Sequence, residues 1–145
     1  MARLPVPGSD ENNWGSLLNE FLRVAHHEDG KLKGTYVRAS QYGSLKEAID
    51  AIGTNKETLL VSAPIGLGIS DLTVPETIAL EFLRNGSIGV SSGETLTIQG
   101  AIVAGLWQIF DLVDTGEVVF GSHAKQVYPQ WFGAQGDGQT DDTNT

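Results

Sequence analysis

Three aspartates near the end of the chain come closest, by type and spacing, to a chemical site. Asp137, Asp141 and Asp142 lie within residues 136–142. Paired carboxylates can act as acid and base on a glycosidic bond, and carboxylates also bind calcium. Their spacing does not match the EF-hand loop, and the glycines around Asp137 favour a tight turn. Asp141 or Asp142 suits the N-cap of a following helix. We therefore expect no catalytic residue and no metal site here.

The histidines are the second candidates for a metal site. His26 and His27 are adjacent, so on a helix they point about 100° apart and do not share a face. His123 is distant in the sequence, and the chain has no cysteine. An imidazolium at the end of a helix suits the helix dipole, which favours a solvated helix end. No nucleophile elbow, zinc-protease motif, P-loop or dinucleotide fingerprint occurs, so no cofactor is expected.

Large aromatic residues could stack on sugars or pack in a core. Trp14 belongs to a helical apolar stripe, and Trp131 and Phe132 belong to a motif that joins two parts of the chain. For these three we expect packing in a core or between chains. Trp107 remains open between packing and a small glycan-binding site.

An N-terminal helix is predicted from the clearest periodicity in the sequence. Pro5 and Pro7 exclude a helix over residues 1–13, which favours an extended arm. Apolar residues then recur at helical spacing over 14–28, and Asp29-Gly30 is a stop signal. The stripe consists of Trp14, Leu17, Leu18, Phe21, Leu22 and Ala25. It must pack on its own domain or on another chain.

We expect the helix to bind a partner through a groove, with the arm alongside it. Aromatic and leucine anchors dominate such interfaces when they are desolvated. The predicted partner-binding residues of the helix are Trp14, Leu17, Leu18, Phe21 and Leu22. The predicted arm residues are Leu4, Pro5, Val6 and Pro7.

A second, short helix follows a polar stretch. Ser44 and Glu47 form the capping-box pattern, and Gly53 is a stop signal. The predicted stripe is Leu45, Ala48, Ile49 and Ile52. A helix of about two turns suits a cap on the elements that follow.

From Thr58 onward the pattern changes to short β runs between turns. The main runs start at residues 58, 77, 95 and 117, about 20 residues apart. Shorter runs lie between them at Leu72–Val74, Ser87–Val90, Ala101–Val103 and Gln108–Phe110. The stretches Leu72–Leu80 and Ile88–Ile98 look alike. The expected corners are Gly66, Gly68, Gly86, Gly89, Gly93, Gly100 and Gly105. Such a period predicts a stacked solenoid, and an antiparallel sandwich or barrel is the alternative.

Composition restricts the class of protein. The 145 residues carry a net charge of −9, which argues against binding to nucleic acid or to an anionic membrane. No run approaches the ~18 apolar residues of a membrane span, and residues 1–10 lack the apolar core of a signal peptide.

Three segments together resemble phage tail proteins. Leu4–Asp10, Trp14–Phe21 and His27–Leu32 resemble the N-terminal attachment segment of tail fibres, tailspikes and related contractile-injection fibres. Val74–Phe82, with Gly86-Ser-Ile and Glu94–Gly100, is similar to the opening coils of pectate-lyase-like right-handed parallel β-helix proteins. Tyr128–Thr143 resembles the signature W-F-G-A-x-G-D-G-x-T-D-D-T, with which that superfamily enters its main β-helix.

The resemblance implies a fold and an arrangement of parts. The fold is mainly β with an N-terminal helix: an arm and amphipathic helix precede the first coils of a right-handed parallel β-helix, in a homotrimer. Residues 1–40 would be the attachment segment. Residues 41–127 would hold the capping helix and the coils, and 128–145 the junction toward a main β-helix. Relatives continue past Asp-Asp-Thr, whereas here Asn144-Thr145 end the chain.

The implied function is a structural one in a virion tail. The partners would be copies of the chain itself, tail or baseplate proteins and, through a downstream region, a host-surface glycan. The alternative is a polysaccharide lyase or glycosidase seen without its catalytic coils, so no enzymatic activity is expected of residues 1–145. The chain would be made in the host cytoplasm without a signal peptide.

Overall fold

The computed structural model describes residues 14–25 and 36–139, and the chain divides into two units, 1–35 and 36–145. In the first unit the structure describes α1 (Trp14–Ala25), which agrees with the predicted helix up to Ala25. The predicted arm and the histidine pair lie outside the described residues. None of the described helices is long and apolar enough to cross a membrane.

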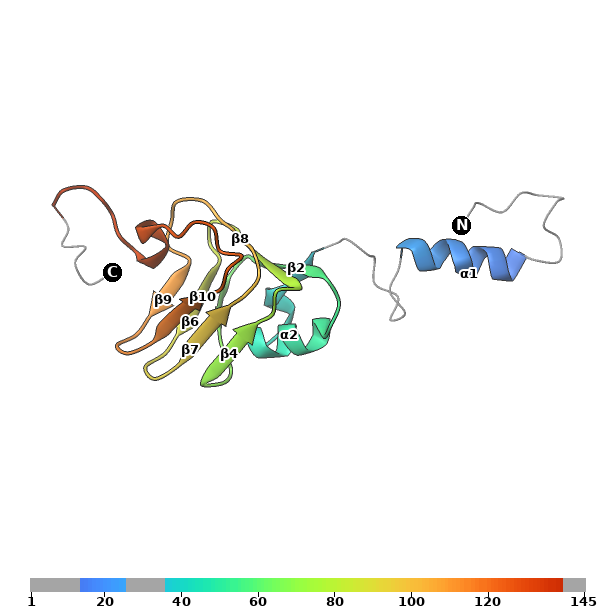
Figure 1. Ribbon diagram of the computed structural model, residues 1–145, viewed down its shortest axis with the longest axis horizontal. Helices are drawn as coiled ribbons and strands as arrows, with labels where there is room; N and C mark the ends of the chain where they lie inside the picture. Colours follow the sequence, from blue (N-terminus) through green and yellow to red (C-terminus); the bar gives the residue numbers. More distant parts are fainter. Residues whose placement is uncertain (1–13, 26–35, 140–145) are drawn as a thin grey trace. The chain divides into compact units, whose positions relative to one another are not determined.

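The second unit is built from parallel strands in three sheets (Figure 1). Sheet 1 has the order β1 (Val37–Arg38), β2 (Glu57–Val61), β5 (Ile78–Phe82), β8 (Ile102–Val103). Sheet 2 has the order β3 (Pro64–Gly66), β6 (Ser87–Val90), β9 (Phe110–Leu112). Sheet 3 has the order β4 (Asp71–Val74), β7 (Thr95–Ile98), β10 (Glu117–Phe120). The fold is therefore mainly β, as predicted, and the antiparallel alternative is wrong for the described strands.

From β2 onward the chain visits the three sheets in turn, and we call one such circuit a coil. Glu57 pairs with Ile78, 21 residues later, and Ile88 pairs with Phe110, 22 residues later. Leu72 pairs with Leu96, 24 residues later. Each coil thus adds one strand to every sheet, and the strands of successive coils stack in register.

Most of the strands predicted by the repeat exist, but the repeat assigns some of them to the wrong sheet. The runs at 58–61 and 77–80 share sheet 1, but those at 95–98 and 117–120 lie in sheet 3. Strands of all three sheets alternate buried and less buried residues in the same way, so the sequence pattern does not distinguish one sheet from another. The similar stretches Leu72–Leu80 and Ile88–Ile98 are consequently not equivalent parts of two coils.

Three further strand assignments differ from the prediction. The short strands β1 and β3 were not predicted. The run Gln108–Phe110 is shifted, since β9 begins at Phe110. Gly66 and Gly89, expected at corners, lie in strands and pair with each other.

The core runs through the middle of the coils as rows of inward-facing residues. Leu59, Leu80 and Ile102 form one row in sheet 1, and Leu72, Leu96 and Val118 form another in sheet 3. Leu59, Leu80 and Leu96 are completely buried, whereas Ile102 and Val118 in the last coil are only partly buried. In these two rows the last coil is therefore less buried than the coil before it, although Phe110 of the same coil is completely buried.

Helix α2 (Leu45–Ile52) covers this core beside β1. Ser44 caps it by accepting a hydrogen bond from the Glu47 N–H, as predicted. The Glu47 carboxylate accepts from the N–H of Gly43, one residue earlier than the expected capping box requires. Gly53 ends the helix at φ 64°, and Leu45 and Ala48 are completely buried.

Backbones of successive coils approach each other closely at several corners, two of which were predicted. A Cβ on Gly86 would lie 1.9 Å from the Val61 carbonyl oxygen, and one on Gly100 would lie 1.9 Å from that of Ile78. Any other residue would force the coils apart there, which explains why both positions are glycine. Gly86 and Gly100 were both predicted as corners.

Candidate functional site

Helix α1 presents apolar side chains to solvent. Leu18 is 46% exposed and Leu22 is 40% exposed, and they lie one helical turn apart. Both belong to the predicted partner-binding stripe. Trp14, Leu17 and Phe21 lie on the same helix, but their side chains are outside what the structure describes, as are Leu4, Pro5, Val6 and Pro7 of the arm.

The second unit closes its own core at the first coil. The side chains of Leu45, Ala48 and Ile52 on α2 are buried there, and the Lys46 N–H donates to the Leu67 carbonyl. The first coil therefore already has a cover within its own unit, so the apolar stripe of α1 is not required as a cap.

The last coil is covered by the 3-10 helix η2 (Pro129–Phe132). The Trp131 indole is 3% exposed and its Nε1 donates to the Gly105 carbonyl at 2.9 Å. The Phe132 ring lies 5.3 Å from that of Phe110 and 6.2 Å from that of Phe120. Of the two predicted alternatives, packing in a core or between chains, the structure shows core packing for Trp131 and Phe132.

Trp107 is half-buried and makes packing contacts. The Arg84 guanidinium lies 6.0 Å from the centre of its ring, within the range of a cation–π interaction. A Cβ on Gly105 would lie 1.8 Å from the ring, so the indole covers that glycine closely. Among the described residues the buried indole nitrogen has no hydrogen-bond partner. These contacts favour the packing alternative.

Asp137 takes the predicted turn role. Its Oδ1 accepts a hydrogen bond from the Gln139 N–H at 2.9 Å, between Gly136 at φ 61° and Gly138 at φ 70°. Asp141 and Asp142 lie outside the described residues. Within the described part of the chain no group of three His, Asp or Glu residues could hold a metal ion.

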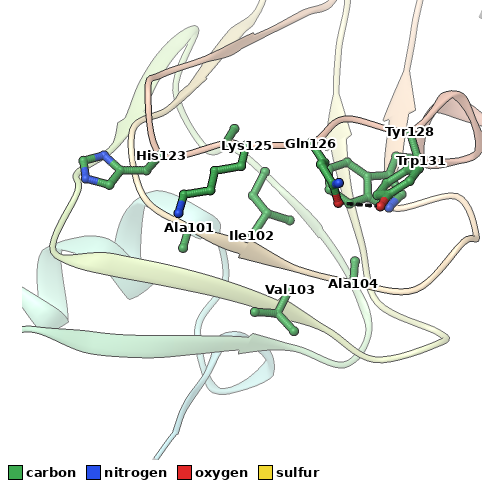
Figure 2. Close-up of a pocket in the computed structure, with 10 residues that line it drawn as sticks. Ala101, Ile102, Val103, Ala104, His123, Lys125, Gln126, Tyr128 and Trp131 are labelled. Atoms are coloured by element: carbon green, nitrogen blue, oxygen red, sulfur yellow. Dashed lines mark hydrogen bonds between the residues drawn. The ribbon is translucent and has the colours of Figure 1, made fainter.

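A groove that was not predicted lies along the edge of sheet 1 (Figure 2). It measures about 400 Å³, and it lies between residues 101–104, which include β8, and residues 123–126. Tyr128 and Trp131 close one end. A pattern of periodicity could not reveal this groove, because it arises where the chain leaves β10 without adding another strand to sheet 1.

The groove is free of acidic side chains in an acidic protein. Its charged and titratable groups are those of Lys125 and His123, and the rest of the lining is apolar, amide or phenol. The Lys125 side chain points toward Ala101, while the Tyr128 hydroxyl donates to Gln126 Oε1 at 2.6 Å (Figure 2). With a net charge of −9 on the whole chain, this lining stands out as suited to an anionic group.

No protein-family model, curated protein sequence or solved structure matches the chain. Its function is therefore inferred from its own residues and geometry.

Proposed function

We propose that this chain is a structural attachment protein, the N-terminal part of a tail fibre or tailspike that is held on a phage tail or baseplate through α1. The observation that carries the proposal is the exposure of Leu18 and Leu22 on a helix that the coils do not need as a cover. Exposed leucines at helical spacing favour seating in a hydrophobic groove of another protein.

Burial of these leucines would contribute substantially to the free energy of binding. Burying a leucine side chain completely contributes about 1.5–3 kcal/mol. Leu18 and Leu22 start 46% and 40% exposed, so each has much of its area left to bury. In a homotrimer three helices would be presented together, and the linked binding events would strengthen attachment without new contacts.

For the coils, we propose the finer fold of a right-handed parallel β-helix. Two observations support it: every described strand pair is parallel, and the chain visits the three sheets in a constant order. Connections between parallel strands of one sheet are right-handed in nearly all proteins. In this proposal residues 128–145 lead toward a main β-helix, where contact with a host-surface glycan would reside.

The chain is proposed to work in the virion tail without enzymatic activity of its own. The alternative remains a polysaccharide lyase or glycosidase whose catalytic coils lie downstream. Incubating the purified chain with capsular and cell-wall glycans should release no product. Product release by residues 1–145 would favour the enzymatic alternative.

The decisive experiment follows incorporation into particles. The variant Trp14→Ala/Phe21→Ala, and separately Leu18→Ala/Leu22→Ala, should fold as the wild type does but fail to enter tails purified from cells that express them. Ser16→Ala/Asn19→Ala changes two exposed polar residues of the same helix and should be incorporated normally. Circular dichroism checks folding, and wild-type incorporation of both apolar variants would contradict the proposal.

A further inference from the structure

We propose that the groove beside β8 binds an extended acidic peptide segment of a partner protein, which pairs with β8 as an added strand of sheet 1. This binding surface is independent of α1 and of attachment to a tail.

The edge of β8 has backbone groups available for pairing. In the described structure β8 is the last strand of sheet 1, with β5 on its other side. Leu80 is in register with Ile102, and the Leu80 N–H donates to the Ala101 carbonyl at 2.9 Å. In a parallel pair with this register, the N–H and C=O of Ile102 face away from β5. They therefore point to the side where another strand would lie.

Residues 36–139 do not use this position themselves. Ile88 and Phe110 are paired in sheet 2, and Val118 and Leu96 are paired in sheet 3, so the last coil completes those two sheets. After β10, the Gly121 N–H still donates to the Ile98 carbonyl, and the Ala124 N–H then donates back to Gly121 in a turn. Residues 123–126 consequently form the far wall of the groove rather than a strand on β8.

The corresponding edge of β9 is blocked, which distinguishes it from β8. Phe110 takes the equivalent register position, and its carbonyl accepts a hydrogen bond from Gln108 Nε2 at 3.1 Å. The Ile109 N–H donates to the Trp131 carbonyl at 3.0 Å. The Phe110 carbonyl is thus already bonded and the cap is bonded to the residue before it, and a covered edge of this kind resists unwanted pairing. Within residues 36–139 no hydrogen bond from a side chain or from the cap satisfies the backbone groups of Ile102 in this way.

The size and charge of the groove indicate the occupant. Residues 102–104 extend over about 10 Å at ~3.3 Å per residue, enough for a short strand. Main-chain bonds supply affinity in strand addition, and pockets for side chains supply specificity. Lys125 points into the groove, and the lining holds no Asp or Glu, so a glutamate or aspartate on the added strand is favoured.

An acidic saccharide fits the groove less well than a peptide. Stacking on a sugar needs an open aromatic face, but Trp131 is only 3% exposed and packs edge-on against Tyr128. The Tyr128 hydroxyl is already bonded to Gln126. The strand edge, in contrast, matches an extended peptide.

The test uses the full chain labelled with ¹⁵N and an acetylated, amidated peptide Thr-Val-Glu-Val-Thr. We expect saturable shifts of the amide signals of Ile102 and Ala104. Replacing the peptide Glu by Gln should weaken binding about two- to fivefold, the range for one exposed ion pair. Lys125→Gln should have the same effect on the Glu peptide, whereas Lys56→Gln, at an exposed lysine outside the groove lining, should not.

Two N-methylated peptides test the main-chain pairing directly. One is methylated at both valines, and the other at the glutamate and the final threonine. An added strand donates only every second N–H to its neighbour, so one of the two should bind and the other should not.

Four outcomes would overturn the proposal. They are the absence of saturable shifts at millimolar peptide, equal binding of both methylated peptides, and shifts at Val118 and Phe120 on β10 in place of those on β8. The fourth is an oligogalacturonate probe that shifts Ile102 and Ala104 more strongly than the peptide, which would assign the groove to a saccharide.

Discussion

Phe110 should be the residue whose loss most weakens the last coil. Its side chain is completely buried, and its ring lies 5.9 Å from Phe82, 5.9 Å from Phe120 and 5.3 Å from Phe132. Phe110→Ala removes a buried ring and leaves a cavity, which costs about 3–5 kcal/mol of unfolding free energy. Phe110→Leu keeps most of the burial but loses the ring contacts, so we expect a cost of about 1–2 kcal/mol.

Urea unfolding followed by tryptophan fluorescence measures both losses. With a slope of about 2 kcal/mol per molar urea, Phe110→Ala should lower the midpoint by roughly 2 M. Combining Phe110→Leu with Phe132→Leu should show a coupling energy of about 0.5–1.5 kcal/mol, because the two rings touch. The control Val119→Ala, at a 40% exposed position, should change stability by no more than about 0.5 kcal/mol. If Phe110→Ala costs no more than this control, the aromatic cluster does not hold the last coil.

Further predictions concern the glycine corners, the N-cap of α2 and calcium binding. Gly86→Ala should destabilise the second unit by about 1–3 kcal/mol because its Cβ would meet the Val61 carbonyl, whereas Gly66→Ala, with open space around it, should be neutral in the same urea titration. Ser44→Ala should cost about 1 kcal/mol through loss of the helix cap, while Ser44→Gly should cost only a few tenths, and thermal melts would show the difference. Millimolar Ca²⁺ should leave the melting temperature unchanged, and a rise of several degrees would point to a carboxylate site.

The second helix shows how far local sequence rules reach. Its cap Ser44, its buried stripe and its terminating Gly53 are set by interactions within a few residues, so the pattern alone predicts them. The bounds of β7 and β10 are likewise predicted, because alternation and turn residues mark each strand locally.

Local rules could not predict which strands pair or where the groove lies, and the reason is physical. Leu72 pairs with Leu96 across a corner sequence whose length differs from that of the other coils, and no local pattern records that length. The groove exists because residues 121–124 turn after β10 and do not add a strand to sheet 1, and this depends on the tertiary structure. The apolar stripe of α1 was visible in the sequence, because helical periodicity needs no partner to be recognised.

The nearly regular spacing between paired residues bears on how such a chain can change in length. Because bonds link residues 21, 22 or 24 positions apart, a coil interacts mainly with the one before and the one after it. Such arrays behave as a series of nearest-neighbour units. A duplication of about one period would lengthen the protein while every inward residue keeps its orientation, whereas an odd insertion within a strand would reverse it. Gene duplication therefore offers a simple route to longer or shorter versions.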